Sequence, residues 1–256
     1  MNVCMFCKTA QPSVASTTGI IIAMARSTKE EALETRNRIL DAAENVFHEN
    51  GVARTSLADV AQAANVTRGA IYWHFKNKGD LFDAMCDRVR LPMEEMVEAC
   101  KDGDEIDPLG QLRATCIFVL QETVQNPHSR KVFDILFHKC EFVDPIDPIS
   151  VRQHECFLDG MANIDRILRN AIAREQLPKD LDIPMACVTL HATVDGLLNN
   201  WLFAPDSFDL AGSAERLIDA CINTLRYAPS LRISGDRDQE SGISDPARNT
   251  SNRRLA

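Results

Sequence analysis

The stretch from Arg54 to Lys78, RTSLADVAQAANVTRGAIYWHFKNK, constrains the fold more than any other part of the chain. Apolar residues recur there at helical spacing in two short groups: Leu57, Val60 and Ala61, then Ile71 and Phe75. Two short helices joined by a tight turn form a helix-turn-helix, so this stretch is predicted to adopt that motif.

Polar residues at the predicted helix ends support the same assignment. Thr55 or Ser56 is placed to cap the first helix, and Asp59 completes a capping-box pair with Ser56. Thr67 is placed to cap the second helix. Asn65 lies in the predicted turn and tolerates the left-handed backbone that such a turn requires.

Outside its apolar face, the motif gathers groups suited to phosphate oxygens and a glycine that allows a close approach to a DNA backbone. The predicted DNA-binding residues are Thr55, Ser56, Thr67, Arg68, Gly69, Tyr72, His74 and Lys78. Between Val52 and Lys78 the single carboxylate, Asp59, is outnumbered by the cations Arg54, Arg68, Lys76 and Lys78. A local basic excess is typical of a DNA-binding face, whereas a purely structural turn has no need of it.

The same residues carry a family resemblance. TRNRILDAAENVFHENG, which ends at Gly51, and TRGAIYWHF at Thr67–Phe75 resemble the DNA-binding domain of TetR-family repressors. DPLG at 107–110, HKCEF at 138–142 and DGLLNNWLFAPDSFDL at 195–210 are similar to the AcrR-type branch, which controls multidrug efflux pumps. The resemblance extends from Met24 to about Leu231. It implies a ligand-responsive repressor of an efflux pump operon, with a double-stranded DNA operator as its partner.

Helical periodicity also dominates the rest of the chain. Most windows after Glu30 show a period near 3.6, and aromatic residues make up only 6% of the 256 residues. We therefore expect an all-α protein of about nine helices. An N-terminal three-helix DNA-binding domain would precede a C-terminal helical ligand-binding and dimerisation domain. The predicted boundaries are a disordered or mis-called extension over 1–28, the two domains over 29–77 and 78–231, and a disordered tail over 232–256.

The formal net charge of −9 does not exclude nucleic acid, because the charge is unevenly distributed. Residues 24–90 carry as many cations as carboxylates, whereas residues 91–256 are acidic. Phosphate binding is a property of one local face, and an acidic second domain keeps the protein soluble.

The nine cysteines mostly lie singly on apolar helical stripes, and the chain shows no secretory signal. Buried thiols in a reducing cytoplasm account for them better than a disulfide framework does. No window reaches the length of a membrane span, so a cytoplasmic protein without membrane contact is expected. Cys4 and Cys7 form a C-x-x-C, but no second ligand pair follows at zinc spacing, so neither a metal nor another cofactor is predicted.

The last two long predicted helices, about 184–203 and 214–227, are apolar enough to be buried on more than one side. A second copy of the chain would cover such a surface. We therefore expect a homodimer with a four-helix interface, whose two DNA-binding domains contact a palindromic operator.

A ligand cavity is expected among the helices between 109 and 203, where apolar side chains and a few polar groups converge. The candidate ligand-binding residues are Leu112, Cys116, Val119, Phe133, Phe137, Phe157, Ile164, His191, Val194 and Asp195. By resemblance, these positions match those at which drug-responsive repressors contact hydrophobic compounds. Phe133, Phe137 and His191 favour small hydrophobic or aromatic inducers through stacking. Each aromatic residue alone is equally compatible with core packing, and Asp195 with the dimer interface or an internal hydrogen bond.

Three other functions fit the sequence less well. An enzyme is not expected, because the chain has no nucleophile elbow, phosphate-binding loop, dinucleotide fingerprint or zinc-protease motif. A TetR-like repressor that responds to oxidants through cysteine is the alternative, with Cys140 beside Lys139 as the candidate for a lowered thiol pKa. A protein-binding adaptor is disfavoured by the intact set of phosphate-type donors.

Overall fold

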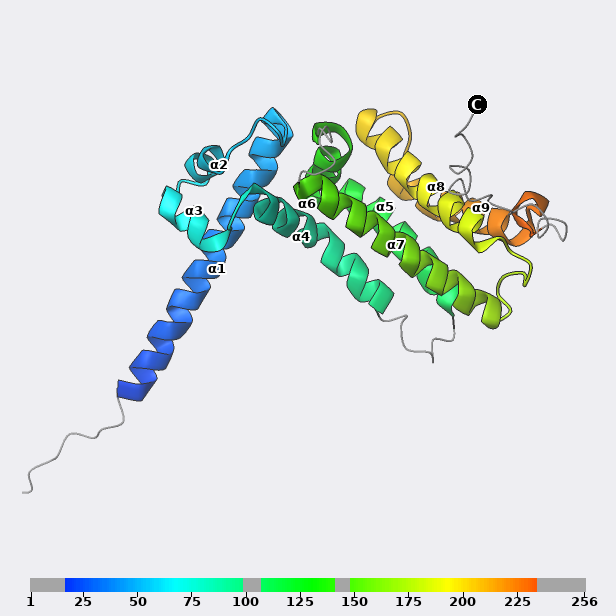
Figure 1. The fold of residues 1–256 in the computed structure, drawn as a ribbon, viewed down its shortest axis with the longest axis horizontal. Coiled ribbons are helices and arrows are strands. Elements are labelled where there is room, and N and C mark those ends of the chain that lie inside the picture. Colours follow the sequence, from blue (N-terminus) through cyan, green and yellow to red (C-terminus); the bar gives the residue numbers. More distant parts are fainter. Residues whose placement is uncertain (1–16, 99–106, 141–147, 234–256) are drawn as a thin grey trace, which may run out of the picture. The chain divides into compact units, whose positions relative to one another are not determined.

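The computed structural model describes the backbone of residues 17–98, 107–140 and 148–233, and the side chains of 29–92, 107–140 and 148–233. Within these ranges the chain is helical, which confirms the predicted fold class (Figure 1). In chain order the elements are α1 (Thr17–Asn50), α2 (Leu57–Ala63), α3 (Arg68–His74), α4 (Lys78–Glu98), α5 (Pro108–Gln125), α6 (Pro127–Asp134), the π-helix η1 (Ile135–Lys139), α7 (Pro148–Ala173), α8 (Ile183–Phe203), α9 (Leu210–Tyr227) and the 3₁₀ turn η2 (Pro229–Leu231).

The chain divides into two compact units. Of the described residues, the first comprises 17–88, 134–140 and 148–149, and the second comprises 89–98, 107–133 and 150–233. The predicted boundary before Lys78 therefore lies too early, because the first turns of α4 pack on α1. The ring centroids of Phe47 and Phe82 are 6.1 Å apart in an edge-to-face arrangement.

Helix α1 forms the centre of the first unit. One of its faces is fully buried, and α2 packs against it while α3 packs against α2. The helix ends at Asn50 because Gly51 adopts φ 81°, a left-handed conformation that residues with a Cβ rarely adopt. The buried face consists of Ile39, Leu40, Ala43 and Phe47.

The start of α1 differs from the prediction. Residues 17–28, assigned to a disordered or mis-called extension, continue the helix, so the expectation of disorder is wrong for this segment. No proline occurs between Thr17 and Asn50, and adding a residue to an existing helix is far easier than nucleating a new one. The rest of the predicted extension, including Cys4 and Cys7, lies outside the described residues.

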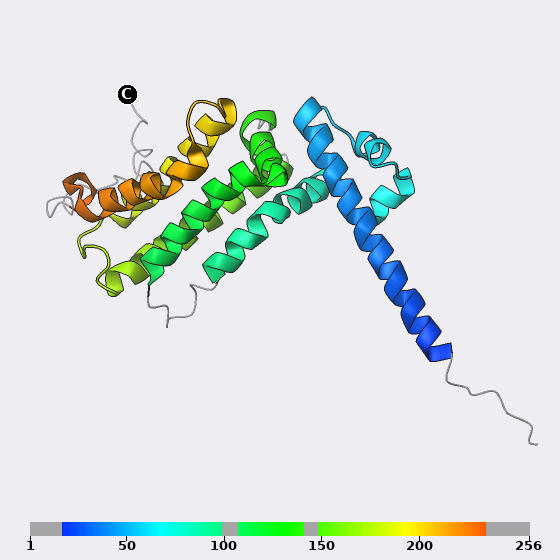
Figure 2. The ribbon, with the colours of Figure 1, turned by 180° about the vertical axis from the view of Figure 1, so that it is seen from behind.

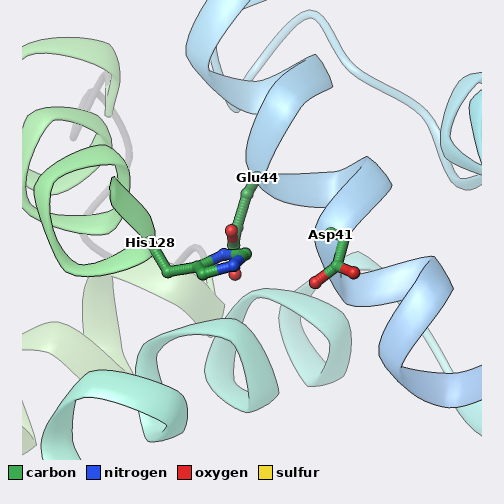
Figure 3. Close-up of side chains that lie close together, drawn as sticks. All are labelled: Asp41, Glu44 and His128. Carbon is green, nitrogen blue, oxygen red and sulfur yellow. The ribbon is translucent and has the colours of Figure 1, made fainter. Parts of the chain in front are cut away.

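A buried carboxylate ties α4 to α1 within the first unit. The side chain of Glu44 is 1% exposed, and its Oε1 accepts a hydrogen bond from Arg88 Nη1 at 2.8 Å. The same nitrogen donates to Asp41 Oδ1 at 2.6 Å. Figure 3 shows the Asp41 and Glu44 side chains on successive turns of α1. A charge at this depth is tolerated because it is paired and hydrogen-bonded.

In the second unit, α5 packs against α8 and α9, and α8 against α9 (Figures 1 and 2). The guanidinium of Arg113 on α5 makes a bidentate contact with Asp219 on α9, with distances of 2.5 Å from Nε to Oδ1 and 2.9 Å from Nη2 to Oδ2. The apolar layer beneath includes Leu120, Ala214, Ile218 and Leu225. These contacts form the scaffold on which the cavity described below is built.

The end of the second unit also differs from the prediction. Arg232 and Ile233 were assigned to the disordered tail, but Arg232 forms a β-bridge with Leu181, and Ile233 N donates to Asp180 O at 2.9 Å. Arg232 Nη1 also donates to Leu225 O at 3.1 Å. Backbone pairing with a distant segment places these two residues in the fold, and sequence composition does not report such pairing. The remainder of the predicted tail lies outside the described residues.

None of the helices in the described ranges is long and apolar enough to cross a lipid bilayer. The cysteines in those ranges are all free thiols: Cys86, Cys116, Cys140, Cys156, Cys187 and Cys221.

Candidate DNA-binding face and ligand cavity

Local side-chain caps define the two short helices of the first unit. Ser56 caps α2, since Asp59 N donates to Ser56 Oγ at 3.3 Å and Ser56 N donates to Asp59 Oδ2 at 2.8 Å. This confirms the predicted capping box, and the hydrogen bonds from Ser56 lower the pKa of Asp59. Thr67 caps α3 by accepting from Ala70 N at 3.1 Å. Asn65 adopts φ 53°, the left-handed conformation predicted for the turn.

Helix α3 presents most of its surface to solvent. Ile71 is its one fully buried side chain, while Arg68, Gly69 and Tyr72 are exposed and Thr67 is exposed at its start. A Cβ added at Gly69 would meet only Thr67 Oγ1, at 3.8 Å, so this surface is open. The exposed residues thus offer a hydroxyl, a guanidinium and a phenol beside a small gap, which suits contact with a DNA backbone.

Trp73 is an exposed residue that the sequence-based set did not include. Its side chain is 72% exposed, and its ring lies 4.5 Å from that of His74 at an interplanar angle of 88°. Burial, and secondarily the positive charge of Arg36, lowers the pKa of His74, which favours the neutral imidazole. The sequence signal for Trp73 was its place next to Tyr72, since these two residues follow the one buried position of the helix, Ile71.

Two predicted DNA-binding residues have internal partners instead. Thr55 is 4% exposed and its hydroxyl donates to Gly51 O at 2.8 Å. Lys78 Nζ donates to Val52 O at 2.8 Å and to Ala53 O at 3.2 Å. Both side chains thus satisfy carbonyl groups in the segment after α1, where helix-terminal carbonyls lack partners. Thr55 is therefore too deeply buried to reach a phosphate, which corrects its assignment, whereas Lys78 is half-buried and its DNA contact stays a prediction.

The second unit contains a cavity of about 310 Å³. Its walls come from α4, α5, α6, α7 and α8 and are largely apolar. The lining residues are Arg90, Leu112, Thr115, Cys116, Val119, Phe133, Cys156, Asp159, Gly160, Asn163, Ile164, Ile167, Leu190, His191, Val194, Asp195 and Leu198. A cavity of this size, with apolar walls and a few polar groups, is typical of sites for small organic ligands.

Eight of the ten predicted ligand-binding residues line this cavity: Leu112, Cys116, Val119, Phe133, Ile164, His191, Val194 and Asp195. Phe137 does not: it lies on the π-helix η1, which belongs to the first unit. Phe157 does not either. It follows Cys156 on α7, is 46% exposed, and sits edge-to-face with the ring of His191 at 5.1 Å.

The polar side of the cavity contains a coupled pair on α8. His191 Nδ1 lies 3.3 Å from Asp195 Oδ2. Burial raises the pKa of Asp195, and the charge of His191 partly offsets this effect. His191 is thus an internal partner that offsets only part of the cost of burying Asp195. Sequence reasoning missed Arg90, Asp159 and Asn163, although Asp159 and Asn163 lie four residues apart and so share a face of α7.

The proposed oxidant-sensing cysteine is not supported by its surroundings. Burial raises the pKa of the Cys140 thiol to about 12. The prediction of a lowered pKa is therefore wrong: the neighbouring Lys139 is adjacent in sequence, but desolvation dominates. Burial likewise raises the pKa of Cys116, in the cavity wall, to about 12.

Two family models match the chain. The model for bacterial regulatory proteins of the tetR family matches residues 39–85, which include α2 and α3. The model for the C-terminal region of the MAATS-type transcriptional repressor matches residues 107–227, which include most of the cavity wall.

Named relatives match over nearly their whole length. The probable HTH-type transcriptional regulator ArpR of Pseudomonas putida is 46% identical over 209 residues, covering 82% of this chain and 100% of ArpR. The crystal structure of NalD, the secondary repressor of the MexAB-OprM multidrug efflux pump in Pseudomonas aeruginosa, superposes with a TM-score of 0.66 at 35% identity, covering 76% of this chain and 98% of NalD. A complex of SmeT from Stenotrophomonas maltophilia with triclosan gives a TM-score of 0.69 at 34% identity, covering 79% of this chain and 96% of SmeT.

The helix-turn-helix in the first unit, the cavity in the second and the extent of these matches agree. The chain belongs to the TetR family of bacterial transcriptional regulators.

Proposed function

We propose that this protein is a ligand-responsive transcriptional repressor of a multidrug efflux pump operon. In this proposal it binds a palindromic operator as a homodimer and is released by hydrophobic or aromatic compounds. The observation that carries the proposal is the presence in one chain of an exposed helix-turn-helix face and an apolar cavity of about 310 Å³.

The DNA-binding role is supported by the exposed residues of the motif. Ser56, Thr67, Arg68 and Tyr72 present polar groups to solvent, and Gly69 leaves room beside them. Hydroxyl and phenol groups bond to phosphate oxygens, and a guanidinium bonds to phosphate or to a guanine edge. Trp73 joins this proposed set because it is the most exposed of the large apolar side chains in the motif.

The response to hydrophobic compounds is supported by the cavity and by relatives. SmeT, a repressor of a multidrug efflux pump, has been crystallised with the aromatic biocide triclosan. NalD is likewise a repressor of such a pump. The apolar walls of the cavity in this chain, including Phe133 and Ile164, suit the same kind of compound.

Homodimerisation is supported by apolar side chains exposed on α8 and α9. Met185 and Val188 are about half exposed, Tyr227 is 74% exposed, and Phe203 at the end of α8 is 82% exposed. Large exposed apolar groups on neighbouring helices are typical of an interface. A two-fold pair of such chains carries two DNA-binding units, as a palindromic site requires.

The proposed switch has two states. The operator-bound dimer holds its two DNA-binding units at the half-site spacing, and the ligand favours a state in which α4 tilts and that spacing changes. Helix α4 begins in the DNA-binding unit at Lys78 and reaches the cavity at Arg90. The size of the response is limited by the difference in ligand affinity between the two states.

A fluorescence anisotropy titration tests the proposal. The purified full-length protein is titrated onto DNA from upstream of its own gene and of neighbouring pump genes, with and without triclosan and a panel of plant phenolics and hydrophobic antibiotics. Tight, salt-dependent binding that such a compound reverses is the expected result. DNA binding that no compound affects would contradict the proposed ligand response. No binding to any of these DNAs would contradict the proposed repressor function.

A further inference from the structure

The cavity contains a thiol held beside a cation. Cys156 on α7 lines the cavity and is half-buried, and Arg90 Nη1 on α4 donates to its Sγ at 3.7 Å. A partly accessible sulfur next to a guanidinium is the kind of electropositive surrounding in which reactive cysteines are found. The proposed repressor function makes no use of this pair.

Cys116, the second thiol in the cavity wall, provides a contrast. It is 9% exposed, and burial raises its pKa to about 12, so almost none of it is thiolate at neutral pH. The thiolate is the nucleophilic form of cysteine. Cys156 is less buried than Cys116 and receives the Arg90 hydrogen bond, so it is the sulfur of the cavity wall placed for reaction with a bound compound.

The cavity walls would hold an aromatic compound next to this sulfur. Phe133 and Ile164 are apolar wall residues, and Gly160 lies one turn from Cys156 on α7. Confinement beside a nucleophile raises the rate of reaction well above that of a free collision. We propose that Cys156 is a covalent capture site for aromatic electrophiles, namely quinones and aromatic α,β-unsaturated ketones, that enter this cavity.

The proposed step is a conjugate addition. The sulfur of Cys156 forms a bond to the carbon β to a carbonyl, the carbon–carbon π electrons shift toward the carbonyl oxygen, and the proton lost by the thiol is taken up by the product. With a quinone, a further proton shift from the ring carbon to oxygen gives a hydroquinone thioether. The product contains all atoms of thiol and quinone, so no other oxidant or reductant is needed.

Such an adduct would change a contact between α7 and α4. Alkylation adds a ring to the sulfur that receives the Arg90 hydrogen bond, so the contact between α7 and α4 is replaced. Because α4 continues to Lys78 at the DNA-binding motif, the adduct is expected to favour release of the operator. This consequence rests on the proposed function, whereas covalent capture itself does not.

The first test measures adduct formation without DNA. The full-length protein is treated with limiting 1,4-naphthoquinone, and the occupancy of each cysteine is followed by peptide mass spectrometry. Cys86, which is also half-buried but does not line the cavity, serves as an internal control. Cys156 is expected to react roughly tenfold faster than Cys86. Added 1,4-dimethoxynaphthalene, which does not react with thiols, should compete for the cavity and slow the modification of Cys156 but not that of Cys86. Equal rates at the two sites, or no protection, would overturn the proposal.

Variants of Arg90 separate a chemical role from a structural one. Arg90→Gln is expected to slow modification of Cys156 several-fold, while Arg90→Lys, which keeps the charge, should retain most of the rate. Unchanged melting temperatures in both variants would confirm that the fold is intact, and equal rates in Gln and Lys variants would count against the cationic neighbour.

Operator release then distinguishes the two proposals. Naphthoquinone should release the wild-type protein from DNA, and this release should persist after the free compound is removed. The Cys156→Ser variant should regain operator binding after the same removal. Reversible release of both proteins by 1,4-dimethoxynaphthalene would show that the repressor switch is intact. Selective modification of Cys156 without release by either compound would overturn the ligand response but leave the covalent site standing.

Discussion

The imidazole Nε2 of His48, near the end of α1, lies 3.0 Å from Oδ2 of Asp134, the last residue of α6. The other carboxylate oxygen of Asp134 lies 2.7 Å from Nδ1 of His138 in η1. Lys139 O accepts a hydrogen bond from Val52 N at 3.1 Å. The residue before Asp134 is Phe133, a cavity-lining residue. A short covalent path therefore joins the cavity wall to contacts made by the DNA-binding unit.

This path predicts a variant that binds ligand but responds weakly. Asp134→Asn weakens the contacts with both imidazoles and leaves Phe133 in place, so ligand affinity measured by calorimetry should change little. The ligand's effect on operator affinity should fall by about fivefold, within the range typical of allosteric coupling. Glu49→Gln, an exposed change next to His48, is the matched control. An undiminished ligand effect in Asp134→Asn would show that the signal takes another route.

Arg68 and Lys78 should respond differently to removal of their charge. Arg68→Ala should weaken operator binding and reduce the salt dependence by about one phosphate contact, with no loss of stability, because Arg68 is exposed. Lys78→Ala should instead cost about 1–3 kcal/mol of unfolding free energy, because Val52 O and Ala53 O lose the hydrogen bonds from the Lys78 ammonium. Anisotropy over a salt series and urea unfolding separate the two effects. A stable Lys78→Ala protein with a reduced salt slope would instead support the predicted phosphate contact of Lys78.

The ion pair on α1 and α4 predicts a large stability effect. Arg88→Ala removes the guanidinium from the buried Glu44, and loss of one partner of a buried pair typically costs about 3–5 kcal/mol. Asp41→Ala removes the other carboxylate bound by Arg88. Because the side chain of Asp41 is 52% exposed, its loss should cost about 0–1 kcal/mol. Urea denaturation measures both, and similar values for the two variants would contradict the assigned depth of Glu44.

Asp195 predicts a pH dependence of stability. Burial raises its folded-state pKa above 3.8, so the folded protein binds this proton more tightly than the unfolded chain does. Its contribution to stability therefore falls as pH rises through the window between 3.8 and the raised pKa. Asp195→Asn lacks this titration and should melt at a slightly higher temperature than the wild type at pH 7.5, with the difference shrinking toward pH 4.5. The effect is small because the side chain is 46% exposed. A difference that grows toward acid pH would reverse the sign assigned here.

Local sequence signals determined much of the architecture. Helical periodicity, the Ser56 and Thr67 caps, and the left-handed turn at Asn65 act over a few residues, so the helix-turn-helix could be placed without knowledge of the rest of the chain. The inward positions on the later helices were predicted for the same reason. A face with apolar spacing must be buried, and six such predicted positions do line one cavity.

Only the tertiary structure decided what each buried or polar side chain meets. Lys78 lies 26 residues from the Val52 carbonyl that it binds, and Arg90 lies 66 residues from Cys156. Sequence spacing within one helix carries no information about such partners. The thiol of Cys140 shows the same limit, because desolvation by the surrounding fold outweighs the lysine beside it in sequence. The sequence thus determined the helices and their inward faces, and the three-dimensional packing of distant segments determined the chemistry available at each site.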